Sequence, residues 1–216
     1  MNYLAHGRHA LEQPYLLAGT ATPDWLAACD RPSRIRERAA APHHHDADPR
    51  LAAFARGIVQ HHQDDARFHS NRAFVELSLG FSVRLREILG PGEGHRTSFL
   101  GHILVELLLD SELARREPGL LDAYYAVIDG LDAAWIVDTV TRLAPRPPER
   151  LGWMLDVFRR ERFLYDYADD AKLFVRLNHI MRRVGLPQIP DTLGDFLSSA
   201  RTEVSGRTEE LLQAER

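Results

Sequence analysis

Residues 54–74, FARGIVQHHQDDARFHSNRAF, have the periodicity of an amphipathic helix whose inward stripe changes from apolar to polar. Phe54 and Ile58 lie on one face at a spacing of four residues. The same face continues with three polar residues, again four apart: His61, Asp65 and His69. Side chains at this spacing are neighbours on a helix, so the three can reach one point beside it. The pattern is also compatible with an ordinary solvated helix end, because histidine and aspartate are common on surfaces.

A second helical stretch, SFLGHILVELLLDSEL at 98–113, is apolar nearly all round, which is typical of a buried central helix. Its ionisable residues between positions 99 and 109 are His102 and Glu106, which share one face. A buried carboxylate needs a partner, which can be an arginine, the histidine-rich helix or a metal ion. A His–Glu hydrogen bond that only fixes helix register remains the structural alternative. Because both helices offer imidazole and carboxylate one turn apart, we favour a metal site inside a helical bundle.

Helical periodicity recurs along the chain, and alternating β-branched runs bounded by tight turns are missing, so the sequence predicts an all-α fold. With 216 residues, 44% of them hydrophobic, we expect one helical domain over 1–216. Its motifs fall in 1–116, and 117–216 is expected to supply packing helices. Prolines and helix caps divide the chain into predicted helical segments at 2–13, 22–29, 34–40, 48–69, 72–89, 97–116, 120–130, 133–143, 149–168, 170–184 and 191–215.

The composition excludes several classes of protein. A formal charge of −4 argues against a general electrostatic nucleic-acid binder. No apolar run approaches the roughly 20 residues that span a bilayer, so no membrane association is expected. The single cysteine, Cys29, cannot form an internal disulfide, and the first residues do not have the pattern of a signal peptide. We therefore expect a cytoplasmic location.

Two further candidate ligands lie near the beginning of the chain. In GTATPDWL at 19–26, Thr22 has the position of an N-cap and Pro23 that of the first helical residue, which places Asp24 in a first helical turn. An aspartate there commonly serves the helix dipole. His6 stands in the apolar context NYLAHGRHAL, where a hydrogen-bonded core histidine is the usual interpretation.

The order of four motifs resembles the bacterial acyl carrier protein phosphodiesterase family. These motifs are MNYLAH at the beginning, a glycine followed by PDWL, GIVQHHQDD with a following aromatic residue, and an apolar helix carrying a histidine near position 100. That family is similar to the HD-type metal-dependent phosphohydrolases, which are helical bundles around a divalent metal. The resemblance covers about residues 1–110 and implies the same fold and a phosphodiesterase activity.

Five positions match the family motifs: His6, Asp24, His61, Asp65 and His102. The sequence also departs from the family, because His62 stands where the family has arginine and Gly101 replaces an aspartate. Phe68-His69 likewise replaces Thr-Asp, and Arg8 replaces the second histidine of the opening motif. These departures indicate a divergent subgroup with a rearranged ligand set.

A mixed nitrogen and oxygen ligand set suits Mn²⁺, Fe²⁺ or Zn²⁺, and the resemblance favours Mn²⁺. The predicted metal ligands are His6, Asp24, His61, Asp65, His69, His102 and Glu106. We expect Asp24, Asp65 and His62 to take direct part in catalysis, with His62 as a proton-transfer group. A bound metal would activate water and neutralise charge on a phosphate.

Arginines can hold phosphate bidentately, and the candidates are Arg96, Arg176 and Arg182. The expected partner is holo acyl carrier protein, which is acidic and could dock on the arginines at 34–38. The expected activity is removal of its phosphopantetheine. Two alternatives stay open: a phosphohydrolase acting on a small nucleotide or other phosphoester, and a non-catalytic helical protein whose metal is structural.

Overall fold

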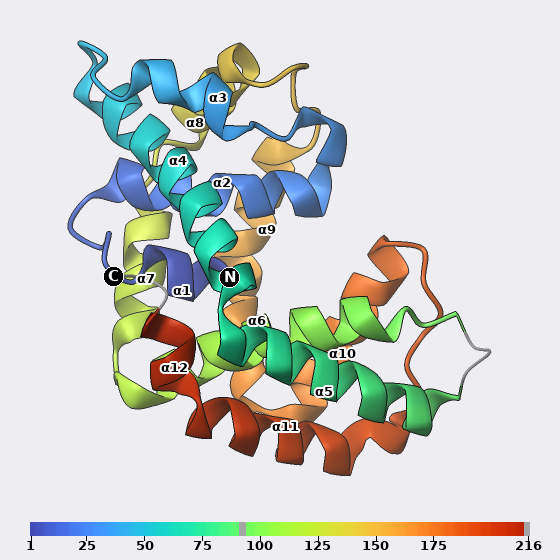
Figure 1. Ribbon diagram of the computed structural model, residues 1–216. Coiled ribbons are helices and arrows are strands. Elements are labelled where there is room, and N and C mark those ends of the chain that lie inside the picture. Colours follow the sequence, from blue (N-terminus) through green and yellow to red (C-terminus); the bar gives the residue numbers. More distant parts are fainter. Residues whose placement is uncertain (91–93, 214–216) are drawn as a thin grey trace. The chain divides into compact units, whose positions relative to one another are not determined.

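The computed structural model of the protein describes residues 1–90 and 94–213, and every regular element in these ranges is helical (Figure 1). The all-α prediction is confirmed. The more specific likeness to the HD-type fold stays a prediction. The chain divides into two compact units, each built from two separate stretches of sequence. The expectation of one helical domain over 1–216 also stays a prediction.

The first unit comprises Met1–Ala66 and Pro118–Arg162. Its buried centre is aromatic, with Tyr124, Tyr125 and Phe158 inaccessible to solvent. Helix α2 packs on α1, α7 and α9 around this centre. The unit contains α1 (Tyr3–Gly7), α2 (Pro14–Cys29), η1 (Arg31–Ser33), α3 (Glu37–Ala40), η2 (Ala41–His43), most of α4 (Pro49–Ser70), α7 (Leu120–Asp129), α8 (Ala133–Leu143) and α9 (Leu151–Glu161).

The second unit comprises Arg67–Glu117 and Phe163–Arg216. Helix α6 is its central element and packs on α5, α11 and η3. The unit contains the end of α4, α5 (Arg72–Leu89), α6 (Thr97–Arg116), η3 (Phe163–Ala168), α10 (Asp170–Arg183), η4 (Asp191–Leu193), α11 (Gly194–Gly206) and α12 (Thr208–Leu212). No helix among the described residues of either unit is long and apolar enough to cross a membrane.

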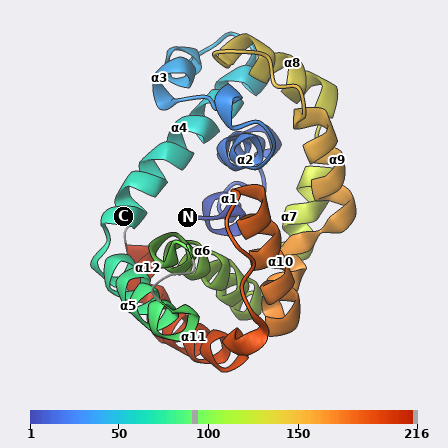
Figure 2. The ribbon, with the colours of Figure 1, turned by 90° about the vertical axis from the view of Figure 1, so that its right-hand side faces the viewer.

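Two glycines let α2 and α4 touch backbone to backbone within the first unit (Figures 1 and 2). A Cβ built on Gly57 would lie 2.1 Å from the carbonyl oxygen of Leu16, and one on Gly19 would lie 2.2 Å from that of Phe54. Neither obstacle is a side chain that could rotate away. The close crossing brings His61, one turn after Gly57, beside α2, where the first candidate site lies.

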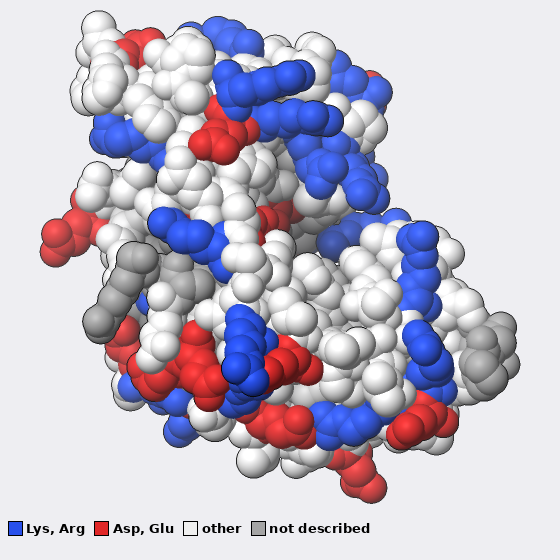
Figure 3. Space-filling view, in the orientation of Figure 1, with Lys and Arg blue, Asp and Glu red and all other residues white. Residues whose placement is uncertain are grey.

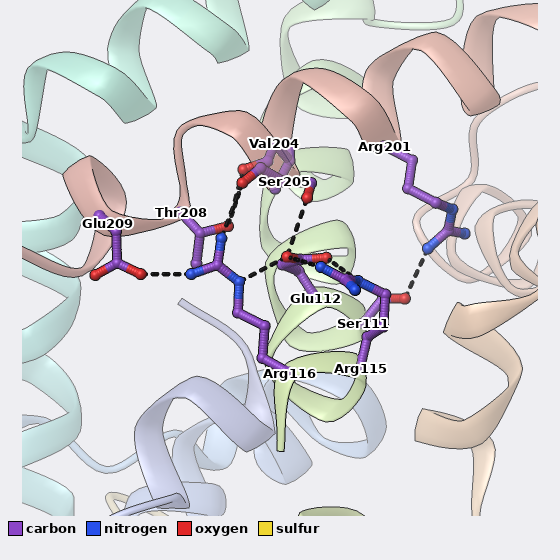
Figure 4. Close-up of polar contacts among 9 residues, drawn as sticks. All are labelled: Ser111, Glu112, Arg115, Arg116, Arg201, Val204, Ser205, Thr208 and Glu209. Atoms are coloured by element: carbon purple, nitrogen blue, oxygen red, sulfur yellow. Dashed lines mark hydrogen bonds and ion pairs between the residues drawn. The ribbon is translucent and has the colours of Figure 1, made fainter. Parts of the chain in front are cut away.

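A buried ion-pair network joins α6 to α11 and α12 within the second unit (Figure 4). Glu112, whose side chain is 5% exposed, accepts hydrogen bonds from Arg115, Arg116 and Ser205. Arg116 also pairs with Glu209 of α12. Charge-assisted hydrogen bonds of this kind are about twice as strong as neutral ones. The network therefore fastens α11 and α12 to the central helix α6.

Several predicted boundaries agree with the structure, because local signals are strong there. Asn71 accepts hydrogen bonds from the backbone of Ala73 and Phe74, which caps α5 and ends α4. The prediction for the beginning of the chain was wrong. Residues 8–13 are not helical, and α2 begins at Pro14, so Thr22 and Pro23 lie inside a helix rather than at its start.

The C-terminal prediction was wrong as well. Segment 149–168 is divided into α9 and η3 at Arg162, whose φ of 44° is left-handed. Segment 191–215 consists of η4, α11 and α12, and its last two residues lie outside the described part of the chain.

Candidate metal centres

The first candidate metal centre lies in the first unit and consists of His6, His61 and Asp65. Helix α1 supplies His6, and the end of α4 supplies the other two residues one turn apart. The Nε2 atoms of His6 and His61 lie 3.2 and 3.4 Å from the two carboxylate oxygens of Asp65. The two imidazoles stack with their ring centroids 4.1 Å apart. One ligand atom from each residue lies within 4.8 Å of the others, so the group can hold a metal ion.

The neighbouring groups set the orientation of each ring. His61 donates from Nδ1 to the carbonyl oxygen of Thr20 at 2.8 Å, because a carbonyl can only accept. This fixes the tautomer and directs the Nε2 lone pair toward Asp65, as in metal sites whose histidines are held by a carbonyl or carboxylate. His6 is fully enclosed, and neither of its ring nitrogens makes a hydrogen bond. Its Nδ1 lies 3.7 Å from Asp64, a buried carboxylate able to orient it.

Burial and charge have opposite effects on the ionisation of this group. Burial raises the pKa of Asp65, but His6 and His61 outweigh that effect and hold it far below its ordinary range. The ammonium of Met1, 2.7 Å from Asp65, acts in the same direction. Burial lowers the pKa of His6, but Asp64 and Asp65 outweigh it and raise the net value. The group therefore carries an ionised carboxylate, the form that ligates a cation.

The second candidate metal centre lies in the second unit and consists of His69, His102 and Glu106. His69, in the last turn of α4, donates from Nε2 to Oε1 of Glu106 at 2.9 Å. His102 stands one turn before Glu106 on α6, with its Nε2 3.2 Å from the same oxygen. The carboxylate is 10% exposed, whereas both imidazoles are about one third exposed. This group is therefore open to solvent on its histidine side.

Aromatic residues wall the second group. The ring of Phe74 lies 5.0 Å from His69 and 4.8 Å from His102, measured between centroids. Phe68 packs behind Phe74 at 4.6 Å. Burial raises the pKa of Glu106, but hydrogen bonds from His102 and His69 contribute to a net value well below its ordinary one.

Both groups have the composition of two imidazoles and one carboxylate. Three protein ligands leave coordination positions for water or substrate, as in hydrolytic and oxygen-activating metal sites. Neither group contains a thiolate, so Cys29 is not needed, in agreement with the predicted ligand chemistry.

Six of the seven predicted metal ligands belong to these two groups, and the seventh, Asp24, belongs to neither. Asp24 stands inside α2, whereas the sequence predicts it in the first turn of a helix. His62 donates from Nε2 to the carbonyl oxygen of Ile35 at 2.9 Å and belongs to neither group. Burial is the main cause of its lowered pKa. Its proton-transfer role stays a prediction, and Nδ1 would have to transfer the proton because Nε2 is engaged with Ile35.

The predicted phosphate-binding arginines have different surroundings. Arg176 is paired with Asp166 at 2.6 Å, so its guanidinium is already engaged. Arg96 is exposed, precedes α6 and has a left-handed φ of 49°. Arg182 is exposed near the end of α10. Their binding of phosphate stays a prediction.

Two groups beside the first centre were missed in the sequence. Asp64 adjoins Asp65, but it is one position off the four-residue stripe that guided the choice of ligands. The carbonyl of Thr20 carries no sequence signal, because any residue has one. Only the glycine-mediated crossing of α2 and α4 reveals it.

Comparisons with known protein families, curated proteins and solved structures found no match to this chain. The family resemblance thus rests on the sequence motifs alone.

Proposed function

We propose that this protein is a metal-dependent phosphodiester hydrolase whose catalytic ion is held by His6, His61 and Asp65. The observation that carries the proposal is the enclosed imidazole of His6, which makes no hydrogen bond with either nitrogen and faces a carboxylate. A buried polar side chain without a hydrogen bond is costly unless it has another task, and metal ligation is one. His61, held by the carbonyl of Thr20, is preset for the same task.

The residues of the first centre have distinct parts in this proposal. A divalent ion, when bound, supplies Lewis acidity toward a phosphoryl oxygen and lowers the pKa of water. His6 and His61 hold the ion from the closed side of the group, where both are buried. Asp65, 29% exposed, forms the side that a substrate can approach. Asp64 keeps the imidazole of His6 oriented.

An arginine-rich segment supports an acidic substrate such as holo acyl carrier protein, the partner that the sequence motifs imply. Its four exposed arginines have no ion-pair partner among the described residues: Arg31, Arg34, Arg36 and Arg38. In Figure 3 basic side chains gather beside α3. The segment is attached to α4 by the Ile35–His62 and Glu37–Gln63 hydrogen bonds, next to His61 in sequence. Such a basic surface attracts an acidic protein toward the first centre.

The test is incubation of the full-length protein with holo acyl carrier protein and Mn²⁺, Fe²⁺ or Zn²⁺, with released phosphopantetheine measured by mass spectrometry. We expect release by the native protein and none by His61→Ala. The double variant R34E/R36E is expected to slow this reaction at least tenfold and to leave hydrolysis of bis-p-nitrophenyl phosphate unchanged, because that diester is too small to need the segment. R86E/R183E is the matched control, since both arginines are exposed, belong to the other unit and are not candidate site residues.

The outcomes separate the alternatives. Hydrolysis of the small diester without release from the carrier protein favours a phosphohydrolase of small phosphoesters. Absence of both activities with every metal contradicts the proposal.

A further inference from the structure

We propose that His69, His102 and Glu106 form a second metal site, which binds its own ion within the second unit and prefers imidazole-binding ions such as Zn²⁺, Fe²⁺ or Co²⁺. The inference goes beyond the proposed function and does not depend on it. The sequence motifs place His102 in one ligand set with His61 and Asp65. In the structure its neighbours are instead His69 and Glu106, two residues by which the sequence departs from the family pattern.

The carboxylate of Glu106 lies where two imidazoles meet. Two imidazole Nε2 atoms, at 2.9 and 3.2 Å, address the same oxygen of Glu106. The two rings lie 4.6 Å apart between centroids and are inclined by 47°, so their Nε2 atoms converge. Convergence of two nitrogens and one oxygen is the ligand arrangement of mononuclear sites for first-row transition metals.

Two buried carboxylates of helix α6 have different partners. It buries another carboxylate, Glu112, and there the partners are the guanidinium groups of Arg115 and Arg116. That is the ordinary way to neutralise a structural carboxylate, because arginine is charged at all relevant pH values. Glu106, six residues earlier, faces two imidazoles instead. An imidazole is the commonest metal ligand in proteins, whereas it is an inferior permanent counter-ion.

The second group is also preorganised and accessible to solvent. Phe74 contacts both imidazoles, and Phe68 supports Phe74, so the rings are held by packing and not only by the carboxylate. On α6, Gly101 allows close approach to α5, because a Cβ there would lie 2.7 Å from the carbonyl oxygen of Ser78. This approach brings His102 and Phe74 together. Both histidines are about one third exposed, so an ion can enter from solvent.

The ligand set also defines the class of ion. Two nitrogens and one oxygen disfavour Mg²⁺ and Ca²⁺, which take oxygen ligands. Three protein ligands leave at least one position open. The site is therefore expected to exchange its ion and to accept a small ligand such as water or an anion.

The test counts ions on the full-length protein. Chelator-treated protein is dialysed against Co²⁺ or Zn²⁺, and bound metal is measured by mass spectrometry, with the visible absorption of Co²⁺ as a second readout. We expect two ions per chain, one for each group. His102→Ala/Glu106→Gln and, separately, His61→Ala/Asp65→Asn should each reduce the count to one. Mg²⁺ should not compete at millimolar concentration.

His179→Ala is the matched control, because it removes an exposed histidine from the same unit and should leave both ions in place. Circular dichroism checks the fold of each variant. If His102→Ala/Glu106→Gln does not fold, the variant His69→Gln is measured instead, because position 69 is partly exposed. This variant should weaken the binding of one ion at least tenfold. An unchanged ion count and affinity in His102→Ala/Glu106→Gln, or in His69→Gln where that variant takes its place, would overturn the inference. Two bound ions without any hydrolysis would instead contradict the proposed function and leave this inference standing.

Discussion

At the scale of single residues, the first candidate metal centre depends on side chains and carbonyls that are not candidate ligands themselves. His61 is oriented by a backbone oxygen and His6 faces the buried carboxylate of Asp64. Groups of this kind fix ring orientation and raise the basicity of the ligand. They would determine how tightly an ion is held, although they would not contact it.

We therefore predict that Asp64→Asn weakens metal binding by about 10- to 100-fold, because His6 loses the charge that orients its ring. The measurement is competition with a chromophoric chelator. Asp156→Asn is the control, since it changes an exposed aspartate of the same unit. Equal affinities of the two variants would show that Asp64 has no part in the site.

The candidate ligands could be chosen from the sequence because imidazole and carboxylate recur at helical spacing. The i and i+4 pairs His61–Asp65 and His102–Glu106 are both present in the structure. Their assignment to two groups could not be predicted, since it depends on which helices meet. Asp24 was chosen because it matches an aspartate of the family motifs, and it belongs to neither group in the structure.

At the scale of elements, the crossing of α2 and α4 decides the geometry of the first centre. The contact exists because Gly19 and Gly57 have no side chains. It brings the carbonyl of Thr20 to His61. A methyl group on either glycine would have to push apart two helical backbones.

We predict that Gly57→Ala lowers the free energy of unfolding by about 3 kcal/mol, the upper part of the range for overpacking, and weakens metal binding as the carbonyl of Thr20 moves from His61. Urea unfolding and metal titration measure the two effects. The control is Gly80→Ala on α5, where a Cβ meets nothing within 4 Å. That variant should gain roughly 0.5–1 kcal/mol from helix propensity. A Gly57→Ala protein as stable as Gly80→Ala would refute the tight crossing.

Element boundaries were predictable from periodicity for α5, α6 and α8, whose limits equal the predicted ones, and α5 and α8 also have side-chain N-caps. They were not predictable where a proline has two possible positions. Pro23 fits the first turn of a helix by local preference, but the helix begins at Pro14. Packing of α2 against α1, α7 and α9 overrides the local signal.

At the scale of the whole molecule, stability toward acid should depend on the buried network of α6, α11 and α12. Hydrogen bonds from Arg115 and Arg116 hold the pKa of Glu112 at about 2, below the ordinary value of 4.5. A carboxylate whose pKa is lower in the folded state stabilises the fold above its unfolded pKa. That contribution is lost as the pH falls from 4.5 toward 2.

We predict that Glu112→Gln lowers the free energy of unfolding by about 2 kcal/mol at pH 7, because it removes charged hydrogen bonds from a buried group. The difference from the native protein should narrow below pH 4, where the native carboxylate begins to lose its advantage. Urea unfolding at pH 7 and pH 3 measures it. Glu203→Gln is the control, as its pair with Arg84 is more exposed. A difference independent of pH would contradict this role of Glu112.

Because each unit consists of two separate stretches of sequence, neither unit can fold until its second stretch has been synthesised. The first unit needs Pro118–Arg162, which supplies Tyr124, Tyr125 and Phe158, and the second needs Phe163–Arg216. His6, His61 and Asp65 therefore leave the ribosome well before the aromatic centre of the first unit exists. At about 5–20 residues per second, the nascent chain waits several seconds for that centre. A metal ion bound in the proposed first centre would then be enclosed by the folded unit only after residue 162 has been added.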